Sequence, residues 1–376
     1  MTLLLHTADW QIGRTYARFA PDDALALAEA RIATVERLAR RAAERGADAV
    51  LVAGDVFDAQ AVSPRTMRRL FNALAPYPGP WVMIPGNHDA ALAEGVWAQA
   101  RRLELLPPNL HLSLQPAIVE LPELQLAVLT APLTQRHTYD DATAWFDEAA
   151  TPAGWLRVGL AHGAVQGLLP EDVDATNPIA PDRAARARLD YLALGDWHGA
   201  RRIDARSWYA GTPEPERFKD NDPGHVLWVR LQGAGAAPQV EAEAIARHRW
   251  RERALSLAVP SDVDEAIALL QACGADEVLS LLLAGHVDLA AHQRLQRALQ
   301  AAQARLRALV VDAAQLRLAP TAEDIAALQA DGYLGAVIAE LRDAAPERRR
   351  TAQDALAILA TLLAEQREAG AAAQRA

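Results

Sequence analysis

Short apolar runs recur through the first half of the chain, and each one ends at a small or polar residue. The runs occupy residues 3–5, 49–53, 81–84, 158–161 and 191–194. None of them is long enough for a helix, and their continuous apolar character is typical of strands that are buried on both faces. Strands of this kind lie at the centre of an open α/β sheet.

Segments with helical spacing of apolar residues separate the first of these runs. Residues 21–45 begin at a proline followed by two acids, which favours a helix start, and Gly46 supplies the end. Their apolar side chains recur on one face of the predicted helix. Ser63 and Pro64 open a second helix that should run to about residue 74, with Ser63 as its N-cap. The order strand, helix, strand predicts an α/β crossover.

Beyond residue 90 the sequence contains both segments with helical spacing of apolar residues and short segments with the alternation of β-strands. We expect helices at 91–106 and near 140–150, short alternating strands between 110 and 130, an irregular loop at 164–185, and closing strands at 191–194, 206–210 and 225–231. Together with the earlier strands, these segments predict an α/β (α+β) architecture. Two β-sheets are flanked by helices, and the core lies in the sheet interior.

Small residues at 233–238 predict the first domain boundary. The following segment alternates again, with extended chain at 241–259, helices at 261–272 and 290–308, and strands at 277–284 and 309–318. After Pro320 we expect only helices, at 323–331, 334–344 and 352–369. The sequence therefore predicts three domains, which are residues 1–235, a small α/β module at 236–320 and a helical tail at 321–376.

Composition narrows the class of protein. The 376 residues include 51% hydrophobic residues, enough for a buried core, and one cysteine, Cys273, which excludes an internal disulfide framework. No apolar stretch approaches the ~18 residues of a membrane span. We therefore expect a cytoplasmic protein without membrane contact.

The net charge of −10 argues against a uniformly basic nucleic-acid-binding protein, because phosphate contacts need clustered lysine and arginine. Arginines do occur near the expected edge of the sheets, at Arg14, Arg18, Arg65, Arg136, Arg201 and Arg202. They are either a local rim that guides phosphates or ordinary solvated surface, and the sequence leaves both interpretations open.

Side chains with oxygen or nitrogen atoms that can bind a metal ion, here called donors, follow each of the five apolar runs. They are Asp9 and Gln11, Asp55, Asn87 and His88, His162, and finally Asp196 and His198. In open α/β sheets, ligands bind at the edge formed by the carboxyl ends of the strands. A single aspartate there would be explained best as a helix cap. Five donor-bearing strand ends are instead explained by a shared metal cluster.

The order of these motifs resembles that of the calcineurin-like metallophosphoesterases. Within them it is most similar to the SbcD-type nuclease subunits of bacterial complexes that process double-strand breaks. The similarity rests on His-Thr-Ala-Asp-Trp at 6–10, Gly-Asp-Val-Phe-Asp at 54–58 and Pro-Gly-Asn-His-Asp at 85–89, with closing strands around 209–214 and 224–229. It covers roughly residues 1–230 and implies a two-sheet metallophosphoesterase sandwich. It also implies that residues 236–320 are a cap domain.

The resemblance implies two divalent ions. We expect Mn²⁺ in the first place and Mg²⁺ as the alternative, because carboxylate and carbonyl ligands suit both. The first ion would take Asp9, Gln11, Asp55 and His198, and the second Asp55, Asn87, His162 and Asp196. His88 would stabilise the transition state or protonate the leaving oxygen. Asp58 and Asp89 are expected to orient or cap neighbouring groups. Gln11 and Asp196 stand where the family pattern has histidines.

The implied function is hydrolysis of DNA phosphodiester bonds, as an exonuclease or endonuclease subunit in DNA repair. The implied partners are DNA and a coiled-coil ATPase of the SbcC type docked through the C-terminal helices, and self-association into a homodimer is left open. A phosphodiesterase acting on small nucleotides is one alternative. A weakened scaffold that binds DNA or the ATPase is another, favoured by Gln11 and Asp196. Trp10 and Trp197 are expected to pack in the core or to stack on a base.

Overall fold

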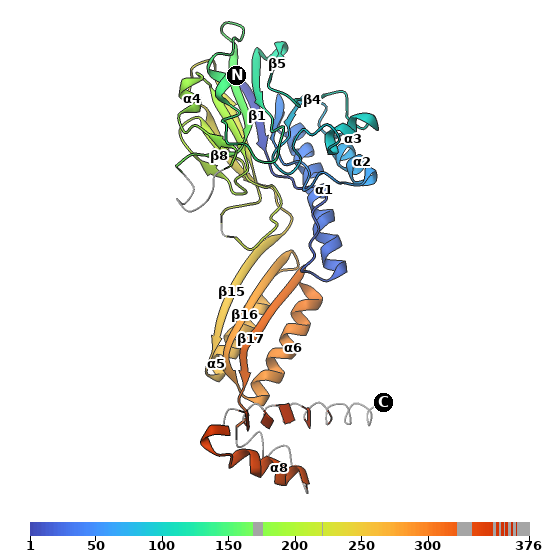
Figure 1. Ribbon diagram of the computed structural model, residues 1–376, viewed down its shortest axis with the longest axis vertical. Coiled ribbons are helices and arrows are strands. Elements are labelled where there is room, and N and C mark those ends of the chain that lie inside the picture. The colour runs from blue at the N-terminus through green and yellow to red at the C-terminus, as the bar shows by residue number, and fades with distance from the viewer. Residues whose placement is uncertain are drawn as a thin grey trace. The chain divides into compact units, whose positions relative to one another are not determined.

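The computed structural model describes residues 1–167, 176–219, 221–321 and 333–348 and part of 351–366. The chain divides into two compact units, Met1–His248 and Arg249–Ala376, which Figure 1 colours by residue number. The helix predicted at 323–331 lies outside the described residues, and the one predicted at 352–369 is only partly described.

The first unit contains two six-stranded sheets. The first sheet has the order β14-β13-β1-β2-β3-β4, with β1 Thr2–Thr7, β2 Ala49–Ala53, β3 Trp81–Ile84, β4 Leu110–Leu112, β13 His225–Leu231 and β14 Gln239–Ala244. The second has the order β11-β12-β10-β7-β6-β5, with β5 Ala117–Leu121, β6 Leu126–Ala131, β7 Leu156–His162, β10 Tyr191–Gly195, β11 Arg201–Arg202 and β12 Ser207–Tyr209. The predicted two-sheet α/β sandwich is confirmed.

The strands that precede the donor residues run parallel within each sheet. In the first sheet Leu5 lies opposite Val50, and Val52 lies opposite Met83. In the second sheet β7 and β10 are parallel, with Leu194 opposite Ala161. The carboxyl ends of these strands therefore reach the same edge of their sheet, where the chain continues into the donor segments.

Apolar side chains fill the space between the two sheets. Leu4, Leu51 and Val82 of the first sheet belong to one buried cluster with Leu160 and Tyr191 of the second. The opposite face of the first sheet is covered by α1 (Pro21–Glu44), α2 (Pro64–Ala73) and α3 (Val96–Arg102). Strands enclosed on both sides must be apolar on both sides, which explains the continuous runs in the sequence.

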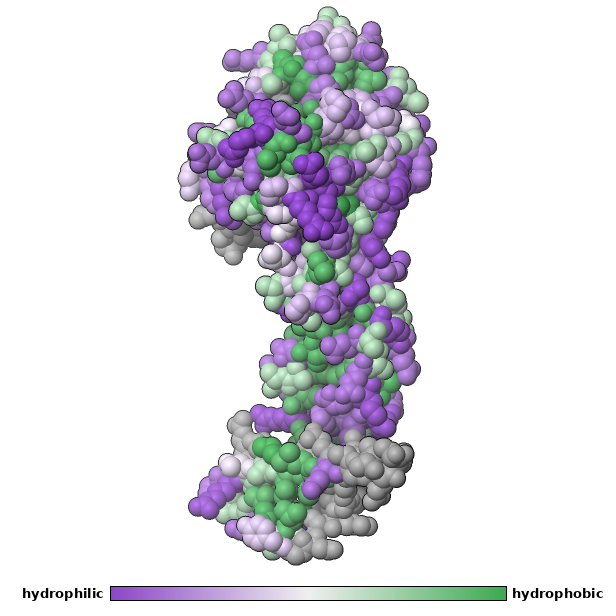
Figure 2. Space-filling model, turned by 90° about the vertical axis from the view of Figure 1, so that its right-hand side faces the viewer, coloured by the Kyte–Doolittle hydropathy of each residue, from purple (hydrophilic) through white to green (hydrophobic). Residues whose placement is uncertain are grey.

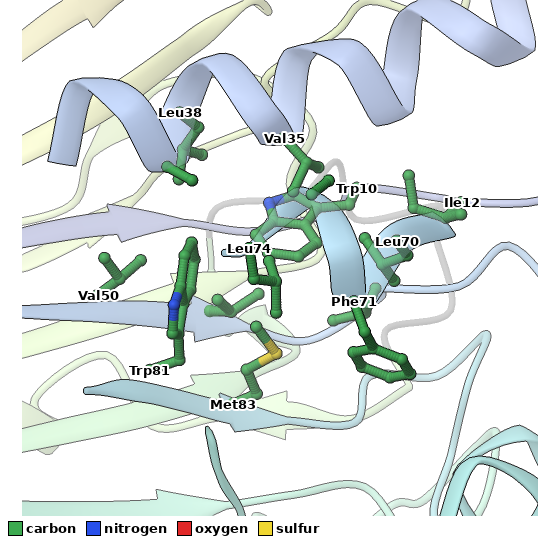
Figure 3. Close-up of a cluster of buried hydrophobic side chains, with 14 of the residues drawn as sticks. Trp10, Ile12, Val35, Leu38, Val50, Leu70, Phe71, Leu74, Trp81 and Met83 are labelled. Atoms are coloured by element: carbon green, nitrogen blue, oxygen red, sulfur yellow. The ribbon is translucent and has the colours of Figure 1, made fainter. Parts of the chain in front are cut away.

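The starts of α1 and α2 confirm the predicted helix signals. Both helices begin at a proline, and Ser63 Oγ accepts a hydrogen bond from the Thr66 backbone N–H at 3.1 Å. Figure 3 shows Val35 and Leu38 of α1 directed toward the tryptophans beneath the helix, and all of these side chains are buried. α1 is thereby fixed on the sheet by its apolar stripe.

Two predicted helices are wrong in length. Only Val96–Arg102 of the segment 91–106 is helical, because Ala91 N bonds to Leu133 O (2.8 Å) and so belongs to an irregular connection. The helix expected near 140–150 is a 3₁₀ turn, Ala144–Asp147. Asp141 accepts hydrogen bonds there from Thr143 N (2.8 Å) and Arg183 Nη2 (2.7 Å), which compete with a longer helix.

Several short elements occupy the predicted loop at 164–185. They are β8 (Ala164–Val165), β9 (Pro178–Ile179) and α4 (Arg183–Arg186), and residues 168–175 are not described. β8 and β9 pair in a separate parallel ladder. The segment is therefore less irregular than the proline content suggested.

The second unit has a parallel sheet in the order β15-β16-β17. Its elements are β15 Arg249–Leu257, α5 Pro260–Ala272, β16 Glu277–Val287, α6 Leu289–Arg305, β17 Ala308–Leu318 and, after a gap, α8 Tyr333–Arg342. Leu281 of β16 and Leu295 of α6 belong to its buried core. β14 pairs with β13 and so belongs to the first unit, before the division at His248. The cap and tail roles of the later segments stay predictions.

Hydrophilic side chains cover much of the face shown in Figure 2. None of the described helices combines the length and the apolar character that crossing a membrane requires.

Candidate metal centre

The carboxyl ends of β1, β2, β3, β7 and β10 supply the candidate site. His162, at the end of β7, places Nδ1 2.8 Å from the carbonyl oxygen of Ala53, at the end of β2. Gly195 ends β10 beside the same carbonyl, where an added Cβ would lie 1.9 Å from the oxygen. Glycine is required at this position, because a side chain would force the two sheets apart at the edge.

Four of the predicted donor residues adopt positive backbone φ angles. The angle is 54° at Asp9, 50° at Gln11, 51° at Asp55 and 102° at Asp196. Such conformations cost on the order of 1–3 kcal/mol each in residues other than glycine. Backbone hydrogen bonds from Asp9 N to Gly54 O (3.1 Å) and from Gln11 N to Asp55 O (2.9 Å) hold the first two loops. Strain held in this way is characteristic of binding and catalytic sites.

Asp55 lies at the centre of the donor set. Its Oδ1 accepts a hydrogen bond from the His88 backbone N–H (2.9 Å), and its Oδ2 accepts one from Gln11 Nε2 (2.7 Å). One ligand atom each from Asp9, Asp55 and His162 lies within 4.8 Å of the other two, and all three residues are buried. Asp55 therefore connects the donor segments that follow β1, β3 and β7.

Three oxygen atoms surround the Nε2 atom of His162. They are Asn87 Oδ1 at 3.1 Å, Asp55 Oδ1 at 3.6 Å and Asp196 Oδ1 at 3.7 Å. Donors bound to one cation at about 2.1–2.2 Å are separated from each other by about 3.0–3.6 Å. The Ala53 carbonyl accepts a hydrogen bond from Nδ1–H, so Nε2 is the nitrogen left to bind a metal ion.

His198 is oriented by a buried carboxylate. Its Nδ1 lies 2.6 Å from Glu216 Oε1, and the Glu216 side chain is only 2% exposed. A carboxylate on one ring nitrogen leaves the other as the metal ligand, which is the usual arrangement of metal-binding histidines. Burial lowers the pKa of His198, but Glu216 and Asp9 outweigh it and raise the pKa above its ordinary value.

Arg31, a buried arginine on α1, connects the segments that carry Asp9 and Glu216. Its Nε donates to Trp10 O (2.8 Å) and its Nη1 to Glu214 O (2.9 Å). Its Nη2 lies 3.6 Å from Glu216 Oε2. Arg31 thus fixes the carboxylate that orients His198, and its loss would remove a buried donor from each of these oxygen atoms.

The side chains of His88 and Asp89 make hydrogen bonds to different backbone groups. His88 Nδ1 lies 2.9 Å from the Asp58 carbonyl oxygen, which assigns the proton to Nδ1 and leaves Nε2 free. Asp89 is fully buried and accepts hydrogen bonds from the backbone N–H groups of Gly86 (2.7 Å) and Val56 (3.0 Å). Asp89 therefore fixes two donor loops, which fits the capping role expected from the sequence.

The donor set carries an excess of buried negative charge. Burial raises the pKa of Asp9 to about 6, and the neighbouring Asp55 contributes to the shift. Burial also raises the pKa of Asp196 and, together with Asp55, raises that of Asp89 to about 7. Burial lowers the pKa of His162, but the surrounding carboxylates outweigh it and raise the pKa to about 9. A divalent cation would relieve this accumulation of charge.

The residues present fit such a cation. Gln11 Oε1 is buried without a hydrogen-bond partner among the described residues, whereas the amide nitrogen is held by Asp55. A buried oxygen without a partner costs about 1–3 kcal/mol, and a cation would satisfy it. Carboxylate and amide oxygens suit Mn²⁺ and Mg²⁺.

The structure brings the predicted donors together at one edge of the sheets. Hydrogen bonds and short N···O distances link five of them, which are Gln11, Asp55, Asn87, His162 and Asp196. Asp9 is close enough to His198 to raise the pKa of that imidazole. Their assignment as ligands stays a prediction. The stacking alternative for Trp10 fails, because this side chain is 1% exposed and packs in the core.

The sequence reasoning missed Arg31 and Glu216. Arg31 lies on the buried face of α1, four residues after Leu27 and four before Val35. A charged residue inside an apolar stripe is a readable signal of a buried polar network. Glu216 has no such signal, because only the fold brings it to His198.

Comparisons with known proteins find a family match within the first unit, which contains the candidate site. A family model described as calcineurin-like phosphoesterase matches residues 2–230. The chain is 28% identical over 272 residues to the DNA double-strand break repair protein Mre11 of Aeropyrum pernix, which covers 66% of this chain and 62% of that protein. It is 28% identical over 283 residues to the D subunit of the nuclease SbcCD of Rhodobacter capsulatus. That match covers 63% of this chain and 68% of the relative. The solved structure of TT1561 of Thermus thermophilus is 14% identical with a TM-score of 0.41, and the match covers 65% of this chain and 99% of that one.

Replacing Glu216 by glutamine should weaken Mn²⁺ binding about 10- to 100-fold, because a neutral amide no longer orients and polarises His198. Isothermal titration calorimetry measures this affinity. Glu241→Gln is the matched control, since Glu241 also pairs with an arginine (Arg45, 2.9 Å) but is 63% exposed. Equal affinities in Glu216→Gln and the wild type would show that Glu216 does not support the site.

Mn²⁺ should raise the melting temperature more at high pH than at low pH. Asp9 and His162 have folded-state pKa values raised to about 6 and about 9, so the metal-free protein loses stability as pH rises through these values. A bound cation replaces the protons, so its stabilising effect should grow from about pH 5.5 to about pH 8.5. Thermal unfolding in EDTA and in Mn²⁺ measures the difference. A constant difference across this range would contradict the prediction.

Proposed function

The chain belongs to the calcineurin-like phosphoesterase family, and from this premise we propose that it is a metal-dependent phosphodiesterase that hydrolyses DNA. The observation that carries the proposal is the convergence of three oxygens on Nε2 of His162 at 3.1, 3.6 and 3.7 Å. These atoms come from three different loops, so their convergence depends on the fold. A donor set of this composition holds a divalent cation at the sheet edge.

We assign the donors to two cations that share Asp55. The first is held by Asp9, Gln11, Asp55 and His198, and the second by Asp55, Asn87, His162 and Asp196. Mn²⁺ is favoured and Mg²⁺ is the alternative, because most of these donors are oxygens. The chemistry that two bound ions would supply here is activation of a water molecule and stabilisation of charge in an in-line displacement.

His88 acts on the leaving group in this proposal. Its backbone N–H bonds to Asp55 Oδ1 at 2.9 Å, which places the residue beside the cluster. The Asp58 carbonyl oxygen lies 2.9 Å from Nδ1 and accepts its proton, so Nε2 is the ring nitrogen left to act on the leaving group. An imidazolium at this place stabilises the transition-state charge and protonates the leaving oxygen.

The names of the two relatives support DNA as the substrate, since one is a DNA double-strand break repair protein and the other a nuclease subunit. The name of the second, which assigns it to the nuclease SbcCD, also supports a partner of the SbcC type, which we take to be a coiled-coil ATPase bound by the C-terminal helices. Tyr333 and Leu334 at the start of α8 are 82% and 38% exposed, as expected of a surface that binds a partner.

Asp55→Ala should abolish both hydrolysis and binding of the two ions, because Asp55 is shared between them. His88→Ala should abolish turnover and leave both ions bound. The assay uses linear duplex and single-stranded DNA with Mn²⁺, and elemental analysis counts the metal. His111→Ala is the control, since His111 is an exposed histidine on β4.

Two results would contradict these assignments. Full DNA cleavage by Asp55→Ala would refute the metal mechanism. Loss of an ion from His88→Ala would show that this residue is a ligand. A metal-loaded wild type that cleaves no DNA would favour the small-nucleotide or scaffold alternatives instead.

Gln11→His should tighten the first metal site, and Asp196→His should move the pH optimum toward neutrality. With Asp9, Asp55 and Asp196 the formal ligand charge is −3, against −2 with histidine at 196. The additional charge would lower the acidity that a bound cation gives to a water molecule, so the wild type should have an alkaline optimum and a Mn²⁺ requirement. Metal titrations and pH–rate profiles test this. Tight Zn²⁺ binding with full activity in the wild type would refute it.

A further inference from the structure

The sequence has 38 lysines and arginines in total, and Lys219 is the only lysine among them. It is exposed and lies three residues after Glu216, the carboxylate that orients His198. An ammonium is a compact, strongly hydrated point charge on a flexible stem, whereas a guanidinium is a planar fork. The single ammonium side chain thus lies in the segment that borders the metal centre.

Two positive charges lie over the ring of Trp197. Lys219 Nζ lies over the Trp197 ring, 4.9 Å from its centroid, and Arg201 Cζ lies over the same ring at 5.0 Å. Both distances fall within the ~6 Å range of cation–π attraction, and tryptophan is the strongest partner for it. Trp197 is flanked in sequence by the predicted ligands Asp196 and His198. The ring that holds the two cations therefore belongs to the residue between two predicted ligands.

The backbone holds the Lys219 segment against the loop that follows β10. Ala200 N donates to Asp222 O at 3.0 Å. Gly199 lies so close to Asn221 that an added Cβ would be 1.6 Å from the Asn221 carbonyl oxygen. Only glycine permits this approach, so the arrangement of Lys219 is specified by the neighbouring chain.

Lys219 and Arg201 make no ion pair with any residue in the described part of the chain. Arg14 differs, because its guanidinium is paired with Asp58 at 2.8 Å and lies 3.5 Å from Glu216. Two arginines of the rim expected from the sequence therefore differ in their partners, because acids surround Arg14 whereas Arg201 lies over an aromatic ring. An aromatic ring leaves the charge of Arg201 uncompensated, so an external anion can pair with it.

The same pairing of a cation with an aromatic ring occurs one residue earlier. Arg18 Cζ lies over the Phe218 ring at 4.7 Å from its centroid. Phe218 directly precedes Lys219, so positive charge supported by aromatic rings continues along this segment.

We propose that Lys219 and Arg201, held against Trp197, bind successive phosphates of one DNA strand beside the metal centre. The proposal rests on the proposed function, which places a phosphodiester in that centre. Since each charge lies about 5 Å from one ring centroid, the two are at most about 10 Å apart. Successive phosphates of a stacked strand advance by about 3.4 Å, so the neighbours of a bound phosphate fall within this span.

Lys219→Ala and Arg201→Ala should each weaken binding of a fluorescein-labelled oligodeoxythymidine of about 20 nucleotides roughly 5- to 10-fold. Fluorescence anisotropy in EDTA measures binding without cleavage. The slope of log K against log salt should become shallower by about 0.7, the value for one phosphate contact on a single strand. An unchanged slope in both variants would overturn the proposal.

Two variants separate a phosphate contact from a general effect of charge. Lys219→Arg keeps the charge and should keep the wild-type slope. Arg102→Ala removes one positive charge from an exposed side chain at the end of α3, which leads to the start of β4 at the opposite edge of the sheet. It should leave affinity and slope at wild-type values. A loss in Arg102→Ala equal to that in Lys219→Ala would overturn the assignment.

The single lysine also allows a direct test. Reductive methylation with ¹³C-formaldehyde labels Lys219 and the Met1 amine and keeps their positive charge. Adding the oligonucleotide should shift the Lys219 methyl signal. The Met1 signal should stay in place, because Met1 precedes β1 at the end remote from Asp9. A Lys219 signal that does not move, or equal shifts of both signals, would overturn the proposal.

Failure of this inference can be distinguished from failure of the proposed function. Lys219→Ala should raise KM for DNA at least five-fold more than KM for bis(p-nitrophenyl) phosphate, which is too small to have a second phosphate. Equal changes for both substrates would refute the phosphate contact and leave the phosphodiesterase function standing. A wild type that hydrolyses neither substrate but binds the strand through Lys219 would refute the function and leave the contact standing.

Discussion

The mutual repulsion of buried carboxylates is the constraint on which the rest of the site depends. Asp9 and Asp55 are buried at the same sheet edge, and Asp89 lies behind them. Burial and proximity raise the pKa of Asp9 to about 6 and that of Asp89 to about 7. Such a cluster is stable only when protons, imidazolium or a cation balance its charge. A divalent cation does so without protonating the ligands, which is why the arrangement fits metal chemistry.

The scaffold holds these donors against their repulsion by rigid, long-range contacts. Positive φ angles at Asp9, Gln11 and Asp55 aim the side chains inward, and backbone hydrogen bonds between the two loops maintain them. Arg31 and Glu216 form a second layer, in which one buried ion pair fixes the imidazole of His198. Pre-organisation of this kind reduces the reorganisation that binding and catalysis would otherwise require.

The net charge of −10 does not by itself oppose the DNA binding that we propose. Charge is distributed unevenly, so the local field and not the sum decides where an anion binds. In our proposal the two cations on Trp197 and the metal ions supply that local positive field. Arg14 is already paired with Asp58, and Arg31 is buried, so neither is available to a phosphate at the surface.

The sequence by itself determined the strands, the first two helices and the donors at the strand ends, because apolar periodicity, proline and capping residues act over a few neighbouring positions. It did not determine the short turn near residue 145, where Asp141 bonds to Arg183 across the fold. It also gave no sign of Glu216, whose contact with His198 exists only after the loop beyond β12 folds back. Tertiary structure decided these features, because hydrogen bonds and ion pairs between distant segments depend on packing that no local pattern encodes.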